Sequence, residues 1–268
     1  MSAVTGYQQT VRVVTFNILN GRRPVDDVVD LVAFGEALAS LEPDVLALQE
    51  VDRNQDRSHR ADLTAVAADA IGAVDHRFVA ALRGGPGATW VAATGEEHPQ
   101  DAAYGIALLS RHPVSAWHVV RLPVVRVHGP MWHRGKRHPS LVRDEPRVAV
   151  AATVQGPGGP LTVANTHLSF LPWWNGRQLR FLERSLRGTG HPLLLAGDLN
   201  MGVARATRTT GMRELISAPT FPWDEPERQL DHLLADGPCR VRGGGAVRLP
   251  ISDHRALVVD LDGHRRTA

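Results

Sequence analysis

The sequence predicts an α/β protein in which two β-sheets pack face to face and helices cover their outer sides. Short segments rich in Val, Leu and Ala recur along the chain between Gly, Pro or polar clusters, which is typical of strands. Two strand–helix–strand units are also similar: 33 residues separate Asn17 from Glu50, and 31 residues separate His167 from Asp198. Two such units predict two packed sheets whose polar strand ends meet at one end.

The elements follow from these patterns in chain order. We expect strands near 11–17, 45–51, 77–82, 104–110, 114–121, 147–154, 161–167, 193–198, 230–235 and 256–261, and helices near 26–40, 60–71 and 175–187. Asp26 is the expected N-cap of the first helix and Asn175 that of the third. No low-complexity linker divides the chain, so we expect a tail over 1–10, a single domain over 11–262 and a second tail over 263–268.

The composition indicates an ordinary globular protein. Hydrophobic residues make up 43% of the chain, and the formal net charge of +2 is too small to indicate nucleic-acid binding on its own. Lys136 is the only lysine, so the basic residues are almost all Arg. This bias fits either a GC-rich genome or phosphate recognition by guanidinium groups.

The sequence also gives expectations for the compartment, the oligomeric state and membrane spans. Cys239 is the only cysteine, which excludes an internal disulfide and fits a reducing compartment. The first residues have no apolar signal core, and no apolar run approaches the roughly 18–20 residues that span a bilayer. We expect a cytoplasmic monomer with no membrane span.

Asn17 and Glu50 each end an apolar run, where a buried strand has no structural use for a polar group. A carboxylate and an amide oxygen are ligands that suit a hard divalent cation such as Mg2+. Asn17 taken alone fits an ordinary turn residue at a strand end. Glu50 is harder to explain structurally, because an unpaired Glu is rarely buried.

Asp198 and Asn200 form a second polar pair after an apolar run. Two residues apart on an extended chain, their side chains point to the same side. The carboxylate could orient or deprotonate water while the amide binds a phosphoryl oxygen. An Asx turn after a strand is the structural alternative.

Asp231 and His254 form a third pair. A buried Asp that accepts a hydrogen bond from imidazole fixes its tautomer and raises its basicity, so His254 would be a general base or a cation that faces transition-state charge. His167 ends its own strand and could contact phosphate or protonate a leaving group. With 13 His in the chain, a satisfied core histidine remains the alternative for either residue.

Together these residues resemble the signature set of the endonuclease/exonuclease/phosphatase superfamily, the DNase I-like fold. The matching motifs are Thr-Phe-Asn17, Leu-Gln-Glu50, Asn-Thr-His167-Leu, Gly-Asp198-Leu-Asn200, Leu-Asp231-His and Ser-Asp253-His254. The resemblance spans residues 11–261. It implies a four-layer α/β/β/α sandwich of two mixed β-sheets and a Mg2+-dependent phosphoester hydrolase, with Mn2+ as a substitute metal.

The resemblance also implies roles for the individual residues. It places the metal at Glu50, with Asn17 and Asp253 nearby. It assigns water activation to Asp198 and to the Asp231–His254 pair, and it assigns phosphate contact to Asn200 and His167. The implied reaction is direct attack of water with inversion at phosphorus and no covalent intermediate.

Ile106 departs from the family pattern. The segment 104–111 looks like the one in which the family usually carries Asn or Glu at the position of Ile106, and in DNase I-like nucleases that Glu pairs with the histidine matching His167. We therefore expect no complete general-acid dyad at His167. The Thr-His-Leu motif favours the DNase I, sphingomyelinase and phosphatase side of the superfamily over abasic-site endonucleases.

Two segments bear on the substrate. The segment 126–146 is basic and forms either a surface near the site mouth or a solvated loop; it contains Arg126, His128, His133, Arg134, Lys136, Arg137, His138 and Arg143. Trp173 and Trp174 could stack on bases, lie at a lipid interface or pack locally. We expect phosphodiester cleavage in nucleic acid. The alternatives are a phosphatase, a phospholipid phosphodiesterase of the sphingomyelinase or phosphoinositide-phosphatase kind, and a noncatalytic binding protein.

Overall fold

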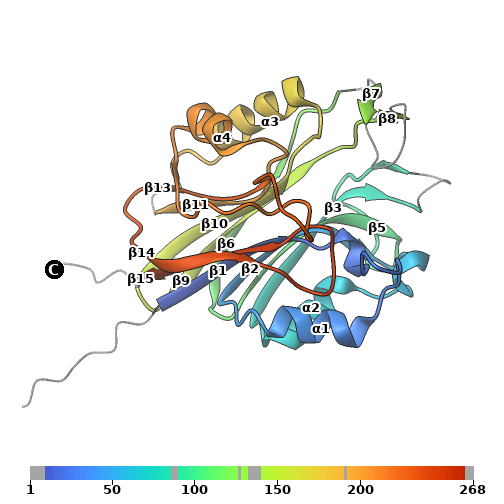
Figure 1. The fold of residues 1–268 in the computed structure, drawn as a ribbon, viewed down its shortest axis with the longest axis horizontal. Helices are drawn as coiled ribbons and strands as arrows, with labels where there is room; N and C mark the ends of the chain where they lie inside the picture. The colour runs from blue at the N-terminus through green and yellow to red at the C-terminus, as the bar shows by residue number, and fades with distance from the viewer. Residues whose placement is uncertain (1–9, 86–89, 126–127, 132–139, 190–191, 263–268) are drawn as a thin grey trace, which may run out of the picture.

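Two β-sheets lie face to face in the computed structural model of the protein, with a pair of helices on each outer side (Figure 1). The structure describes residues 10–85, 90–125, 128–131, 140–189 and 192–262. The four-layer α/β/β/α sandwich expected from the sequence is confirmed.

The first sheet has seven strands in the order β14-β15-β1-β2-β5-β3-β4. In chain order these are β1 (Thr10–Asn17), β2 (Val45–Arg53), β3 (Asp75–Arg83), β4 (Val91–Ala92), β5 (Ala103–Ser110), β14 (Val241–Val247) and β15 (Ala256–Asp262). β1 pairs in parallel with β2 and antiparallel with β15, so the sheet is mixed.

The second sheet has six strands in the order β12-β13-β11-β10-β9-β6. These are β6 (Val114–Arg121), β9 (Val148–Gly156), β10 (Gly159–His167), β11 (Leu193–Asp198), β12 (Arg213–Glu214) and β13 (Asp231–Asp236). β10 and β11 are parallel and the other pairs are antiparallel. A separate hairpin joins β7 (His128–Met131) to β8 (Ser140–Arg143).

The helices cover the sheets in pairs. They are α1 (Leu31–Ala39), α2 (Leu63–Ile71), α3 (Pro172–Ser185) and α4 (Val203–Thr210), with short 3-10 helices η1 (Leu19–Gly21) and η2 (Asp56–Ser58). α1 and α2 cover the first sheet, and α3 and α4 cover the second (Figure 1). Apolar side chains of each pair pack on the sheet that it covers. The parallel β1–β2 and β10–β11 connections therefore run through helices on opposite outer faces.

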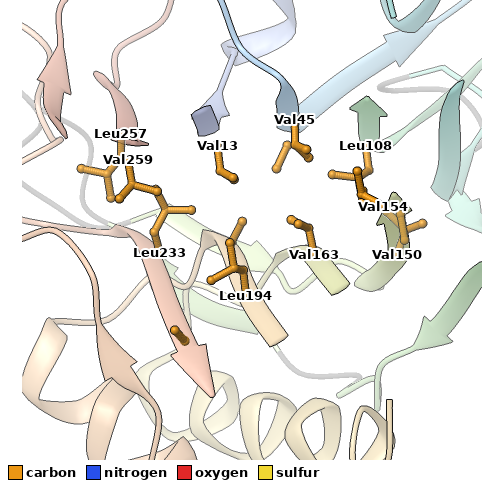
Figure 2. Close-up of a cluster of buried hydrophobic side chains, with 14 of the residues drawn as sticks. Val13, Val45, Leu108, Val150, Val154, Val163, Leu194, Leu233, Leu257 and Val259 are labelled. Atoms are coloured by element: carbon orange, nitrogen blue, oxygen red, sulfur yellow. The ribbon is translucent and has the colours of Figure 1, made fainter. Parts of the chain in front are cut away.

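The main hydrophobic core lies between the two sheets (Figure 2). Val13 and Leu257 from the first sheet face Leu194 and Leu233 from the second, and all four side chains are fully buried. Aliphatic packing of this kind fits the low aromatic content of 5%. Removal of this apolar area from water fixes the two sheets, and hence their strand ends, relative to each other.

The expected helix caps are wrong. α1 begins only at Leu31, because Asp30 rather than Asp26 accepts hydrogen bonds from the first backbone N–H groups of the helix. Asp26 instead binds Arg23 and the backbone of Val28 in a turn.

The third helix begins earlier than expected. α3 starts at Pro172, whose fixed φ suits the first helical position. Asn175 is buried inside the helix and donates from its amide to the carbonyl of Asn200 at 2.9 Å, so it holds the loop after β11 instead of capping α3.

The expected strands are confirmed within a few residues at their ends. Several described elements were not expected: the short strands β4, β7, β8 and β12, the helix α4, and the Gly-rich strand β14. β14 carries three consecutive glycines, which sequence propensity assigns to loops. It is a strand here because it pairs along the length of β15 at the sheet edge.

Candidate active site

The polar strand ends expected to meet do meet, at one end of the sandwich. Pairing within the second sheet places His167 opposite Asp198, and Asp198 opposite Asp231. In the first sheet β1 ends at Asn17, directly beside β2. The amide Nδ2 of Asn17 donates to Oδ2 of Asp198 at 3.1 Å and thereby joins the ends of the two sheets.

A local irregularity aims Glu50 at this point. The β2–β5 pairing shifts by one residue between Gln49 and Val51, and Glu50 sits in the bulge with a left-handed φ of 57°. Asn20 donates to the backbone carbonyl of Glu50 at 3.1 Å, and Asn17 Nδ2 donates to its Oε1 at 3.1 Å. Burial raises the pKa of Glu50, and the hydrogen bond from Asn17 opposes that rise.

Asp198 is buried at the centre of the group. A side chain at Gly197, where φ is 140°, would place its Cβ 2.0 Å from the carbonyl oxygen of Thr166, so only glycine allows this strand end. The backbone N–H of Asn200 donates to Oδ1 of Asp198 at 2.9 Å. Burial and the nearby Asp231 raise the pKa of Asp198 to about 7, while His254 opposes the rise.

Asp231 and His254 form the pair that the sequence suggested. Nδ1–H of His254 donates to Oδ2 of Asp231 at 2.8 Å, which leaves Nε2 at 3.9 Å from Oδ2 of Asp198. Ser252 fixes the loop, because its hydroxyl donates to the carbonyl of Asn17 and accepts from the N–H of His254. Burial alone would lower the pKa of His254, but the charge and hydrogen bond of Asp231 raise it to about 10.

His167 lies on the opposite side of Asp198, with its Nε2 3.6 Å from Oδ2. Burial, together with the positive charge of Arg147, lowers the pKa of His167 well below its usual value. Ile106 is 2% exposed and packs in the core between the sheets, so it contributes no polar partner. The neighbour of His167 is Asp198 rather than a carboxylate on β5.

Asn200 and Asp253 flank the centre. The side-chain amide of Asn200 donates to the carbonyl of Leu168 at 3.0 Å, and its backbone has a left-handed φ of 51°. Asp253 is half-buried, and its negative charge raises the pKa of Glu50 and that of His254. All eight residues predicted from the sequence therefore gather at one end of the sandwich.

A cavity of about 470 Å³ is lined by six of these residues, all except Asp231 and Asp253. Its lining adds groups that the sequence analysis did not identify, including Arg22, Arg57, Arg147, Tyr104 and Phe221. Their positions in loops, in the 3-10 helix η2 or near strand starts gave no periodic signal. The cavity thus combines carboxylates and imidazoles with cationic and aromatic side chains, which is typical of sites for anionic organic ligands.

A second feature missed by sequence reasoning links the sheets beneath the site. The amide of Gln49 donates to Oδ1 of Asn165 at 2.7 Å, and the amide of Asn165 donates to the carbonyls of Leu48 and Ala107, both at 2.8 Å. Both amide side chains are fully buried. The bridge fixes the distance between β2 and β10, and hence between Glu50 and His167.

A family model described as Endonuclease/Exonuclease/phosphatase family matches residues 14–254. The chain belongs to this family. No curated protein matches the sequence.

Solved structures of the same fold cover nearly the whole chain. A family protein from Beutenbergia cavernae is 24% identical, with a TM-score of 0.70 over 96% of this chain and 72% of that one. A mannosyl-6-phosphatase from Bacteroides thetaiotaomicron (14% identity, TM-score 0.60) and sphingomyelinase C from Streptomyces griseocarneus (16%, 0.60) each match over 94% of this chain and 99% of theirs. At these identities the likeness establishes the fold.

The oxygen atoms of this family member fit a divalent cation. Glu50 and Asp198 face the same point and share the single amide donor of Asn17, while burial raises the pKa of both carboxyl groups. Two carboxylates that share one neutral amide donor are a site that a hard cation stabilises. Asp198, Asp231 and His254 also offer ligand atoms within 4.8 Å of one another, but the Asp231–His254 hydrogen bond already occupies two of them.

The sequence analysis named two segments that bear on the substrate, Trp173–Trp174 and the basic segment 126–146. Trp174 packs locally, with its indole N–H donating to the carbonyl of Pro123 at 3.2 Å, whereas Trp173 is 55% exposed. Neither lines the cavity, although Phe170 does. In the basic segment 126–146, residues 126–127 and 132–139 lie outside the described part of the chain, so its role stays a prediction. None of the described helices is long and apolar enough to cross a bilayer.

Proposed function

We propose that this family member is a Mg2+-dependent phosphoester hydrolase that cleaves by direct attack of water. The observation that carries the proposal is the position of Asp198, which lies between the Asp231–His254 pair and the Glu50–Asn17 pair within one cavity. Four ionisable side chains are buried in one chain of contacts: His167, Asp198, His254 and Asp231. A protein that only bound a ligand would have no need for this arrangement, since burying charged groups together costs stability.

Asp198 and His254 divide the work of proton transfer and charge stabilisation. With a pKa of about 7, Asp198 is a carboxylate that can accept a proton from the attacking water near neutral pH. With a pKa of about 10, His254 is a cation that stabilises the negative charge developing on the phosphoryl oxygens. Asp231 orients the imidazole and keeps it charged.

Glu50 would hold the metal, with Asn17 and Asp253 nearby, and Mn2+ is a plausible substitute for Mg2+ by ligand chemistry. A bound divalent cation polarises the phosphorus–oxygen bond and neutralises the oxygens around it. His167 and Asn200 would position the phosphoryl group, His167 as a neutral hydrogen-bonding ring because burial lowers its pKa.

The proposed substrate is a phosphodiester, and nucleic acid is the first class to test. The support is the DNase I-like motif set and the basic segment 126–146. The second candidate is a phosphomonoester, as in the mannosyl-6-phosphatase that shares the fold. It is favoured by the cavity itself, which places Arg22, Arg57 and Arg147 around a single space of limited volume. We further propose a cytoplasmic monomer, and the single buried Cys239 fits a reducing compartment.

The test is a panel of DNA, RNA, phospholipids and sugar phosphates, assayed with and without Mg2+. We expect hydrolysis of at least one class, abolished by EDTA and restored by Mg2+. Cleavage of a phospholipid or a sugar phosphate but not of DNA or RNA would replace the nuclease proposal while leaving the hydrolase. Full activity in excess EDTA would contradict the metal-dependent mechanism.

A further inference from the structure

Arg147 is a buried cation that the proposed reaction has not used. It directly precedes β9, the neighbour of β10, and the pairing of Thr166 with Ala149 puts Arg147 at the same strand end as His167. The residue is only 7% exposed, yet it lines the catalytic cavity. His167 and Glu50 line the same cavity, so Arg147 lies beside the proposed reacting centre.

The hydrogen-bonding capacity of Arg147 is largely unused. A guanidinium carries five N–H donors, and a buried one is stable only when partners satisfy them. Within the described residues, Nη2 of Arg147 lies 3.3 Å from Oε2 of Glu145, and the buried Nε has no hydrogen-bond partner. Glu145 itself is partly exposed, so one solvent-screened ion pair is a weak reason to bury this charge.

Arg57, on the same cavity, shows what a satisfied arginine looks like. Its Nε and Nη2 donate to the two oxygens of the fully buried Asp52 at 2.8 and 2.7 Å, and the guanidinium lies 5.6 Å from the ring centre of Tyr104. Arg57 therefore has a complete structural role. Arg147 lacks such a partner and faces the space in which a phosphoryl group would react.

We propose that Arg147 binds a non-bridging oxygen of the substrate phosphoryl group. The planar fork of a guanidinium matches phosphate oxygens and is fixed here by its burial and by Glu145. It would lie on the His167 side of the centre, across from His254. This inference rests on the proposed hydrolase function and adds to it a residue that touches the substrate.

Inorganic phosphate, the group released by a phosphomonoesterase and a mimic of the reacting centre, is the probe. We would measure its binding to the Mg2+-loaded protein by calorimetry, alongside KM and kcat with the best substrate from the panel. Arg147→Met should weaken phosphate binding by about 10- to 100-fold, as expected for loss of a charge-assisted hydrogen bond. Arg147→Lys, which keeps the charge but loses the fork, should fall between this variant and the wild type.

Two further variants separate substrate contact from a structural role. Glu145→Gln removes the partner of Arg147 and should leave phosphate binding equal or tighter, since the guanidinium is then free for the ligand. A purely structural ion pair would instead give Glu145→Gln and Arg147→Met the same loss. Arg187→Met is the matched control, because Arg187 pairs with Glu183 on the outer face of α3, far from the cavity lining.

The proposal is wrong if Arg147→Lys or a folded Arg147→Met binds phosphate as tightly as the wild type, or if Glu145→Gln weakens binding as much as Arg147→Met. Should Arg147→Met fail to fold, the Lys and Gln variants carry the test. A protein that binds phosphate through Arg147 but hydrolyses nothing in the panel would overturn the proposed function and leave only a phosphate-binding role for Arg147.

Discussion

The two strand–helix–strand units, β1–α1–β2 and β10–α3–β11, use the same architecture to present different chemistry. In the first unit Glu50 leaves the sheet through a bulge and is half-buried at the cavity. In the second unit Asp198 ends a regular strand after Gly197 and is 2% exposed. The half-buried carboxylate suits a metal that exchanges with solvent, and the buried one suits proton transfer.

The local backbone around each strand-end carboxylate sets how buried that carboxylate is, and hence the role that it suits. A one-residue bulge takes Glu50 out of the regular strand pairing, whereas the unbroken pairing of β11 with β10 and β13 keeps Asp198 between two neighbouring strand ends. Asn17 contacts both carboxylates and so couples the units.

The largest expected effect is the loss of activity when Glu50 of the first unit loses its charge. Glu50→Gln keeps the shape of the side chain and removes its charge, so it should weaken Mg2+ binding and lower kcat/KM by at least about 100-fold. Activity should recover in part at high Mg2+. Wild-type turnover with unchanged Mg2+ dependence would remove Glu50 from the metal site.

The second largest effect is a loss of stability when Gly197, at the strand end of the second unit, is replaced. Gly197→Ala places a Cβ against the backbone of Thr166, which can move only if the β10–β11 pairing shifts. We expect a loss of at least about 2 kcal/mol in the free energy of unfolding. Chemical denaturation measures it, and Gly202→Ala, where a Cβ meets nothing within 4 Å, is the control. Equal stability of the two variants would show that β11 tolerates the side chain.

A smaller effect is a pH dependence of stability to which Asp198 of the second unit and His254 contribute. Asp198 has a pKa of about 7 in the folded protein and an ordinary pKa of 3.8 in the unfolded chain. Between these two pH values the folded state therefore binds more protons than the unfolded chain. The stabilisation from Asp198 is therefore complete below about pH 4 and is lost as the pH rises through 7. His254, raised from 6.5 to about 10, adds a second loss toward pH 10.

Thermal unfolding in EDTA from pH 5 to pH 9 measures this dependence. Asp198→Asn should flatten the decline of Tm up to pH 7, and Mg2+ should reduce the decline in the wild type by neutralising the carboxylate. A wild-type Tm that rises with pH across this window, relative to Asp198→Asn, would contradict the raised pKa of the buried Asp198.

The smallest effect lies outside both units. Replacing Arg134, Lys136 and Arg137 together should weaken polynucleotide binding and flatten its dependence on salt, if nucleic acid is the substrate. Filter binding at several salt concentrations measures the slope. A slope identical to that of the wild type would remove the segment 126–146 from the binding surface.

Much of the fold and the site followed from the sequence because several apolar runs end in Asn, Glu, His or Asp in an order that matches one family's motif set, although each ending alone has a structural alternative. The details that failed depend on tertiary context. Asp26 and Asp30 both lie within two residues of a following apolar residue, and the packing of Phe34 and Leu38 on the first sheet fixes where α1 begins. The glycines of β14 form a strand because β15 offers them a partner.

The parts of the site that the sequence did not predict also depend on tertiary context. The bulge at Glu50 leaves no trace in the sequence, since Leu48, Gln49 and Val51 read as one continuous strand. Arg147 is one of many arginines in the chain, and nothing in its neighbours predicts that it is buried. Its burial is visible only once β9 and β10 are paired.

The central claim is that the two units act on one phosphoryl centre, and a double-mutant cycle across them tests it most directly. kcat/KM would be measured for Glu50→Gln, Asp198→Asn and the double variant at saturating Mg2+. Groups that serve one step lose most activity with the first change, so the double variant should be no more than about threefold worse than the poorer single variant. Two losses that simply multiply, in variants with wild-type unfolding profiles, would show that Glu50 and Asp198 act independently.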